Sequence, residues 1–99
     1  MNFKISQEAN RDIENIWLYT YENWSLEQAD RYFNLIIDEI EYLTKNPESG
    51  KNYNQIRKGY YRSRIKSHVI FYKINLKAKQ IEIIRVLHQR MDIDSQLNE

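Results

Sequence analysis

The sequence IRKGYYRSRIKSHVIFYKINLKAKQIEIIRVLH, residues 56–88, contains three segments with the composition of β-strands. Residues 56–65, 68–74 and 81–88 are rich in β-branched and aromatic side chains, and short polar linkers separate them. The last two segments contain consecutive apolar residues, which indicates burial on both faces of a sheet. We therefore predict a three-stranded antiparallel meander whose second and third strands are central and are covered by helices on one side.

Two amphipathic segments precede these strands. In the first, apolar residues recur at spacings of three and four from Ala9 to Trp24, and Ser6 is positioned to cap the helix. The second has its apolar stripe between residues 29 and 43, and its start carries the capping-box pattern of Ser25 followed three residues later by Gln28. Asn46-Pro47 ends it, because the residue before a proline is pushed out of helical geometry. The pattern predicts a helical hairpin.

The order of the segments predicts the fold class. Residues 2–5 alternate polar and apolar side chains, as a short half-buried strand does, so the order is strand, helical hairpin and three-stranded meander, βααβββ. This is an α+β two-layer domain, and 99 residues suffice for one domain. Trp17 and Ile36 are predicted to face the sheet from the two helices.

Composition limits the chemistry that is available. The chain has no cysteine, which excludes disulfides and thiolate sites, and its only imidazoles are His68 and His88. We expect neither a metal nor a cofactor. No stretch approaches the roughly 20 apolar residues that a membrane helix needs, and we predict a cytoplasmic protein that does not contact the membrane.

Charge is divided along the chain. Residues 1–50 carry four Lys/Arg against ten Asp/Glu, whereas residues 51–90 carry eleven Lys/Arg against Glu82 alone. Charge runs are commonly solvated surface, but a block as one-sided as residues 51–90 favours an anionic partner. Either an acidic peptide or a nucleic acid meets that description, and the acidic helices argue against nucleic acid as the main partner.

Several short motifs, taken together, resemble ParE toxins of the RelE/ParE superfamily. They occur in the family's order and span residues 3 to 92. The motifs are Ser6-x-x-Ala9-x-x-Asp12, Ile16-Trp17-x-Tyr19, Gln28-Ala29-x-x-Tyr32, Asn46-Pro47-x-x-Gly50, Ile56-Arg57-x-Gly59-Tyr60, Ser67-His68-x-Ile70-Phe71-Tyr72 and Ile84-Arg85-Val86-Leu87-His88-x-Arg90-Met91-Asp92. Each motif alone recurs by chance, so the resemblance rests on the whole set.

The resemblance implies a toxin of a type II toxin–antitoxin system, a class that includes plasmid stabilization systems. Its partner would be a ParD-like antitoxin that folds over the toxin and binds operator DNA, so that nucleic acid is contacted only indirectly. ParE-like toxins are described as inhibitors of DNA gyrase. The superfamily's other branch, similar to RelE, cleaves mRNA on the ribosome. An inactive relic that still binds antitoxin is a further alternative.

The residues favour an inhibitor over a nuclease. RNA cleavage by 2′-OH attack needs a general base, a general acid and cations near the phosphorus. In RelE-like nucleases an arginine stands at the position that aligns with Val69, and a tyrosine lies near the C-terminus. This chain has Val69, and no Tyr follows Asp92. Arg90 and His88 do not complete the set, so we assign no catalytic residue.

The remaining candidates are contact residues for an antitoxin or a target. Arginine suits bidentate carboxylate recognition, and tyrosine and arginine are enriched in interface cores. The candidates are Arg57, Tyr60, Arg62, Arg64, Arg85, His88 and Arg90. The structural alternatives are a solvated sheet face for the arginines, ion pairs for Arg90 and Asp92, a hydrogen-bonded sheet position for His68, and core or hairpin-rim positions for Trp17 and Trp24.

Overall fold

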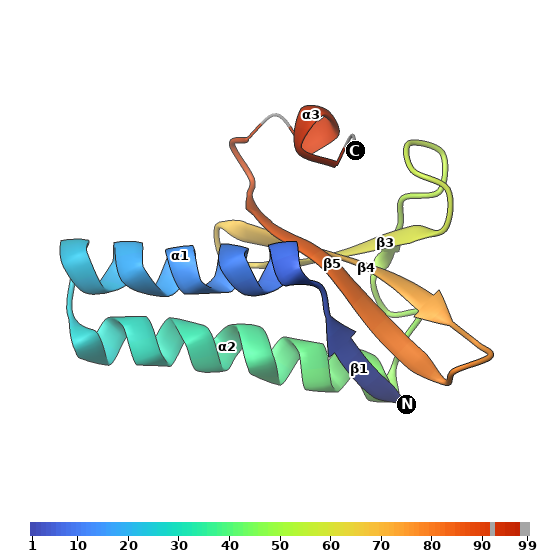
Figure 1. Ribbon diagram of the computed structural model, residues 1–99, viewed down its shortest axis with the longest axis horizontal. Coiled ribbons are helices and arrows are strands. Elements are labelled where there is room, and N and C mark those ends of the chain that lie inside the picture. Colours follow the sequence, from blue (N-terminus) through green and yellow to red (C-terminus); the bar gives the residue numbers. More distant parts are fainter. Residues whose placement is uncertain (92, 98–99) are drawn as a thin grey trace.

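The computed structural model describes residues 1–91 and 93–97, and its architecture is α+β (Figure 1). Asp92, for which an ion pair is the structural alternative, lies outside the described residues. The elements are β1 (Asn2–Ile5), α1 (Gln7–Asn23), α2 (Leu26–Lys45), β2 (Lys51–Asn52), β3 (Tyr60–Ile65), β4 (His68–Asn75), β5 (Gln80–His88) and α3 (Ile93–Leu97). The predicted strand, helical hairpin and meander are confirmed.

One sheet contains all five strands in the order β1-β5-β4-β3-β2. β3, β4 and β5 form the antiparallel meander, with β4 and β5 in the interior of the sheet as predicted. β1 runs parallel to β5, with Asn2 opposite Gln80 and Ile5 opposite Ile83. The chain therefore enters the sheet at the edge beside β5. After the helical hairpin it returns to the sheet at the opposite edge, as β2.

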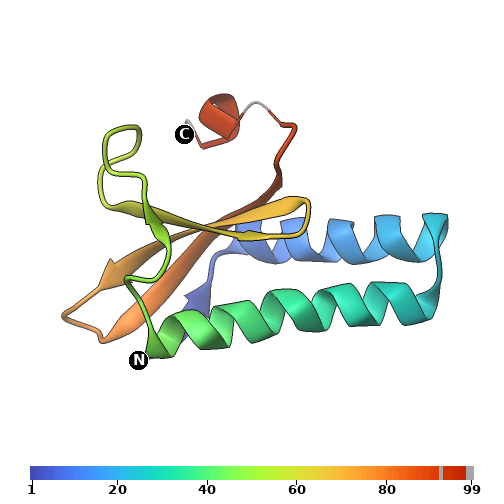
Figure 2. The ribbon, with the colours of Figure 1, turned by 180° about the vertical axis from the view of Figure 1, so that it is seen from behind.

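The helical hairpin begins and turns where the capping residues predict. The Ser6 hydroxyl accepts a hydrogen bond from the Ala9 amide at 3.0 Å, and the Ser25 hydroxyl accepts one from the Gln28 amide at 3.0 Å. The two helices lie side by side on one face of the sheet, and their connected ends project beyond it (Figures 1 and 2). In the described part of the chain, no helix combines the length and apolarity needed to cross a membrane.

The main core lies between the hairpin and the sheet. Ile36, Ile40 and Leu43 of α2 are fully buried against Ile70 and Tyr72 of β4. The prediction for Ile36 is confirmed, and that for Trp17 is wrong. Trp17 is half-buried and contacts the outer side of α2 instead, because Ile13 and Ile16 already fill the sheet-facing side of α1.

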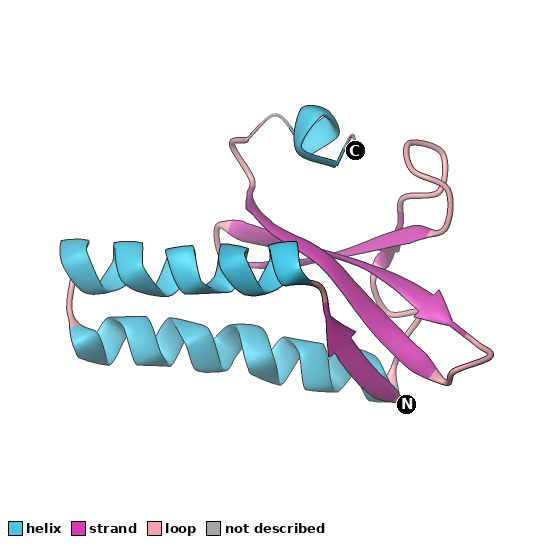
Figure 3. Ribbon diagram, in the orientation of Figure 1, coloured by secondary structure: helices cyan, strands magenta, loops and turns pink. Residues whose placement is uncertain are grey.

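A smaller core lies on the opposite face of the sheet. Leu97 of α3 packs there against Val69, Phe71 and Leu87, and the short helix lies over this face, away from the hairpin (Figure 3). Because alternate residues of a strand face opposite sides, Ile70 and Tyr72 serve the main core while Val69 and Phe71 serve this one.

The predicted first strand of the meander is too long. β3 begins at Tyr60, and two turns precede it. The Tyr53 carbonyl accepts hydrogen bonds from the amides of Ile56 and Arg57, and the Arg57 carbonyl accepts one from the Tyr60 amide. Gly59 has a φ of 81°, which glycine adopts without strain. The preceding residues instead supply β2, two residues long, which the sequence analysis did not predict.

Candidate functional site

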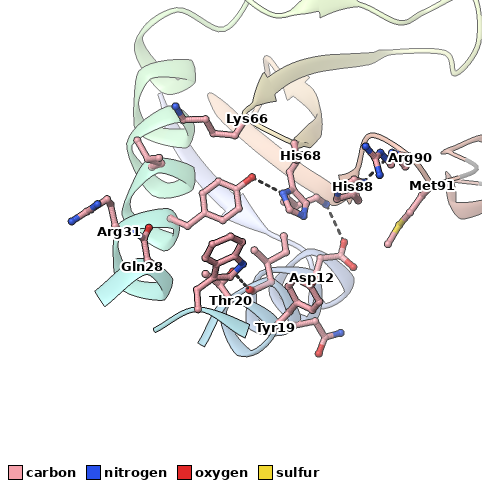
Figure 4. Close-up of a pocket in the computed structure, with 17 residues that line it drawn as sticks. Asp12, Tyr19, Thr20, Gln28, Arg31, Lys66, His68, His88, Arg90 and Met91 are labelled. Atoms are coloured by element: carbon pink, nitrogen blue, oxygen red, sulfur yellow. Dashed lines mark hydrogen bonds between the residues drawn. The ribbon is translucent and has the colours of Figure 1, made fainter. Parts of the chain in front are cut away.

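A groove of about 940 Å³ lies between the helical hairpin and the end of the sheet where β3 turns into β4 and β5 ends (Figure 4). We call it the hairpin groove. Its size is that of a site for a ligand or a peptide side-chain cluster. The apolar side chains that line it come from both helices, the turn between them, β5 and the segment after it, and are Ile16, Tyr19, Trp24, Tyr32, Leu35, Val86 and Met91.

Tyr32, His68 and His88 meet at one wall of the hairpin groove, where Figure 4 shows the two histidines. The Tyr32 hydroxyl lies 2.6 Å from His68 Nδ1 and 3.2 Å from the Ile65 carbonyl oxygen. The rings of His68 and His88 meet edge to face, with their centroids 5.1 Å apart. The interpretation of His68 as a hydrogen-bonded residue of the sheet is confirmed.

The contact between Tyr32 and His68 is uncharged at neutral pH. Burial lowers the pKa of His68 to about 4; neighbouring His88 acts in the same direction, and Asp12 opposes them. Burial raises the pKa of the Tyr32 hydroxyl, partly offset by a hydrogen bond from the backbone at Ser67. The contact between Tyr32 and His68 is therefore a neutral hydrogen bond that joins α2 to β4.

The wall formed by α1 is fixed to β5 through Asp12. Its carboxylate accepts hydrogen bonds from Arg85 Nε at 2.7 Å, from Arg85 Nη2 at 2.9 Å and from the Val86 amide at 3.0 Å. Both side chains are largely buried, and Arg85 Nη1 donates to the Gln96 carbonyl of α3. Arg85 thus links α1, β5 and α3.

The remaining groove candidates lie where β5 ends. The amide of Arg90 donates to His88 Nδ1 at 3.0 Å, which turns the imidazole of His88 back onto its own chain. The side chain of Arg90 is exposed and lies at the rim together with Lys66 and Arg31. Arg31 is paired with Glu27 at 3.1 Å. The groove therefore combines apolar walls with a cationic rim.

The other candidates lie elsewhere. Tyr60, Arg62 and Arg64 are on the face of β3 opposite the hairpin, since Arg62 and Arg64 stand beside Phe71 and Val69. Arg62 lies over the Tyr53 ring, 5.4 Å from its centroid, and Arg64 Nε donates to the Lys66 carbonyl. Arg57 is in the preceding turn, where its guanidinium donates to the Ile56 carbonyl. We call these four residues the β3 surface.

Val69 stands where RelE-like nucleases are expected to have an arginine, and its side chain lies in the smaller core at 5% exposure. A cation there would have to be buried among Phe71 and Leu87. The imidazole of His68 is held by Tyr32, so proton transfer in the hairpin groove would fall to His88. Within residues 1–91 and 93–97, the hairpin groove has the apolar walls and cationic rim of a binding site, but not a full set of groups for acid–base catalysis.

Sequence reasoning missed Asp12 and Tyr32 as residues of the hairpin groove. Asp12 stands beside the apolar stripe of α1, three residues after Ala9, and an acidic residue in that place is the signal that was available. Its partner Arg85 lies 73 residues away, and sequence spacing does not reveal such a pair. Trp24 is 75% exposed, in agreement with the rim position and not with the core.

The family model described as "ParE toxin of type II toxin-antitoxin system, parDE" matches residues 3–93. This chain belongs to the ParE family. It is also similar to proteins named Toxin ParE1 from Mycobacterium tuberculosis and Caulobacter vibrioides, with 36% identity over 95 residues in each case. The matches cover 96% of this chain and 96% of each relative, so this ParE-family toxin aligns with them over almost its whole length.

Solved structures share the fold. A structure of the chromosomal ParDE toxin–antitoxin system from P. aeruginosa matches with a TM-score of 0.76 and 17% identity, covering 89% of this chain and 95% of that one. A chain of the toxin–antitoxin complex RelBE2 from Mycobacterium tuberculosis matches with a TM-score of 0.69 and 18% identity, covering 89% and 96%. At these identities the likeness shows the fold of the RelE/ParE superfamily.

Proposed function

We propose that this ParE-family toxin inhibits DNA gyrase in the cytoplasm and is neutralised by a ParD-like antitoxin bound in the hairpin groove. The observation that carries the antitoxin site is the groove itself, which joins apolar walls to a rim of Arg31, Lys66 and Arg90. A disordered segment that folds on binding needs apolar burial to offset its ordering, and carboxylates at its edges then find cations.

The choice of gyrase over mRNA rests on Val69. RelE-like nucleases, the other branch of the superfamily, have an arginine at the position that aligns with Val69, and here the valine side chain packs in the smaller core. General acid–base catalysis contributes a factor of about 10² to 10⁴. A site that lacks several of its groups would retain little of that rate. Inhibition by binding requires no such groups.

The test compares the two activities directly. Purified toxin is expected to block supercoiling by gyrase or to trap cleaved DNA, and to leave mRNA intact on translating ribosomes. Replacing both His88 and Arg90 by Ala should reduce the inhibition of gyrase, while the antitoxin, whose apolar anchors remain, still binds. Cleavage of ribosome-bound mRNA that is lost in His88→Ala would instead move the protein to the nuclease branch. Antitoxin binding without any inhibition would mark an inactive relic.

The antitoxin site is tested by calorimetry on three variants. Leu35→Glu changes an apolar wall of the hairpin groove, and Lys66→Glu with Arg90→Glu changes its rim. Both are expected to weaken antitoxin binding at least tenfold. We propose that the β3 surface contributes further contacts, so Arg62→Glu with Arg64→Glu should also weaken the complex. If the affinity for the antitoxin changed by no more than about twofold, roughly 0.4 kcal/mol, the β3 surface would not belong to the antitoxin site and would remain a candidate contact surface for the target.

A further inference from the structure

A second groove lies on the other side of the helical hairpin. It is lined by Ile13, Glu14 and Trp17 of α1 and by Asp30 and Phe33 of α2, and its volume is about 290 Å³. We call it the outer groove. It shares no lining residue with the hairpin groove, so both can be occupied at once. The smaller volume suits a single long side chain, not a helix.

Aromatic rings form much of the outer groove and its border. Trp17 Nε1 donates to Asp30 Oδ1 at 2.9 Å, and its ring stacks on Tyr21 with centroids 5.3 Å apart and planes 13° apart. These contacts hold the indole in place. Tyr21 and Phe33 are 48% and 39% exposed. Ring faces that are fixed and accessible to solvent attract cations, and the indole does so most strongly.

No cation within residues 1–91 and 93–97 forms an ion pair with a carboxylate of the outer groove. Within residues 1–91 and 93–97 the ion pairs are Arg31 with Glu27 and Arg85 with Asp12, and neither involves Glu14 or Asp30. The helical hairpin as a whole, residues 7–45, has nine Asp/Glu against three Lys/Arg. The outer groove is thus an aromatic site with two uncompensated carboxylates, set in an acidic surface.

We propose that the outer groove binds an arginine or lysine side chain from a basic segment of a partner protein. The aliphatic stem lies on Ile13 and Phe33, and the cationic head lies beside the Trp17 ring between Glu14 and Asp30. Arginine fits better than lysine, because its planar head stacks on a ring and pairs with a carboxylate at the same time. The proposal does not depend on gyrase being the target, since it rests on the outer groove alone.

The test uses a peptide probe and the fluorescence of Trp17. Trp24→Phe removes the second tryptophan, which lines the other groove. The probe is a 16-residue helical peptide with four arginines on one face, and the same peptide with citrulline in their place is the neutral control. The arginine peptide is expected to change Trp17 fluorescence saturably, and the citrulline peptide is expected to bind at least tenfold more weakly.

Two double variants with the same change of charge separate a site from diffuse attraction. Glu14→Gln with Asp30→Asn removes both carboxylates and keeps an acceptor for Trp17 Nε1, and should weaken binding at least tenfold. Asp38→Asn with Glu41→Gln removes two exposed carboxylates of α2 that do not line the outer groove. This pair should change the affinity for the arginine peptide less than twofold. If the first pair unfolds the toxin, Glu14→Gln alone is expected to weaken binding about threefold.

Three results would overturn the proposal. The first is equal binding of the citrulline peptide, which would mean that the cation is not recognised. The second is equal weakening in both double variants, which would reduce the effect to net charge. The third is a concentration-dependent change of Trp17 fluorescence without any peptide, together with a dimer in sedimentation that Glu14→Gln dissociates. That result would assign the outer groove to a second copy of the chain.

Discussion

Asp12→Ala provides the most direct test of how α1 is held to the sheet. The substitution removes the acceptor of three hydrogen bonds, two from Arg85 and one from the Val86 amide. The side chains of Arg85 and Asp12 are only 16% and 13% exposed, so the guanidinium cannot regain full hydration. Removing one partner of a buried pair costs about 3–5 kcal/mol. The residual exposure places the expected loss at the lower end, about 3 kcal/mol.

Urea denaturation followed by circular dichroism measures this loss. A domain of this size has a free energy of unfolding of about 5–15 kcal/mol, so a loss of 3 kcal/mol gives a large shift of the midpoint. Glu14→Ala is the matched control, because it removes an exposed carboxylate from the same helix without breaking an ion pair. The double variant Asp12→Ala with Arg85→Ala should lose less than the sum of the single variants, since no unpaired charge is left.

A loss below about 0.5 kcal/mol, equal to that of Glu14→Ala, would refute this reasoning. It would mean that the apolar contacts of Ala9 and Ile13 hold α1 without help from Asp12. Additive effects in the double variant would likewise show that Asp12 and Arg85 do not interact energetically, whatever their distance.

Two further predictions concern the core and the histidine cluster. Ile36→Ala should lower the free energy of unfolding by about 2–5 kcal/mol in urea denaturation, because Ile36 is fully buried. Trp17→Ala should lower it by less, because Trp17 is only half-buried. The reverse order would place Trp17 in the core. Because the pKa of His68 is lowered from 6.5 to about 4, the unfolded chain binds a proton there at a higher pH than the folded one, so stability should decrease as pH falls from about 6.5 to 4. Titration of His68 by NMR should show that low pKa, and His68→Gln should flatten this part of the pH profile of stability.

Local features of the chain predicted much of the fold. Ser6 and Ser25 mark both helix starts because a cap is a contact between residues three apart, and such contacts can be inferred from sequence. The change of hydrophobic period after Pro47 similarly marks the meander. Features that depend on distant residues were not predicted, such as the parallel pairing of β1 with β5 or the pair of Asp12 with Arg85.

Trp17 shows where periodicity fails. Ile13, Ile16 and Trp17 all belong to the apolar side of α1, but a helix presents only part of such a broad stripe to one neighbour. The two isoleucines occupy the sheet-facing part, and the indole is left at the boundary with α2, where its N–H finds Asp30. A tryptophan that needs a polar partner is better satisfied at such an edge than in the core.

The candidate site was predicted only in part. The β3 surface lies on one face of the sheet and the groove residues His88 and Arg90 lie on the other, and the sequence alone does not show which of the basic residues share a face.

The separation of charge along the sequence becomes a separation in space. α1 and α2 contain most of the acidic residues, while the strands and their turns contain most of the basic ones. In the described part of the chain, only the pair of Asp12 and Arg85 joins a helix to a strand by an ion pair. The molecule therefore presents an acidic hairpin and a basic sheet to its surroundings. Such surfaces accelerate encounters with partners of opposite charge, and salt weakens that attraction. An acidic antitoxin segment at the groove rim and a basic segment at the outer groove would then bind different faces without competing.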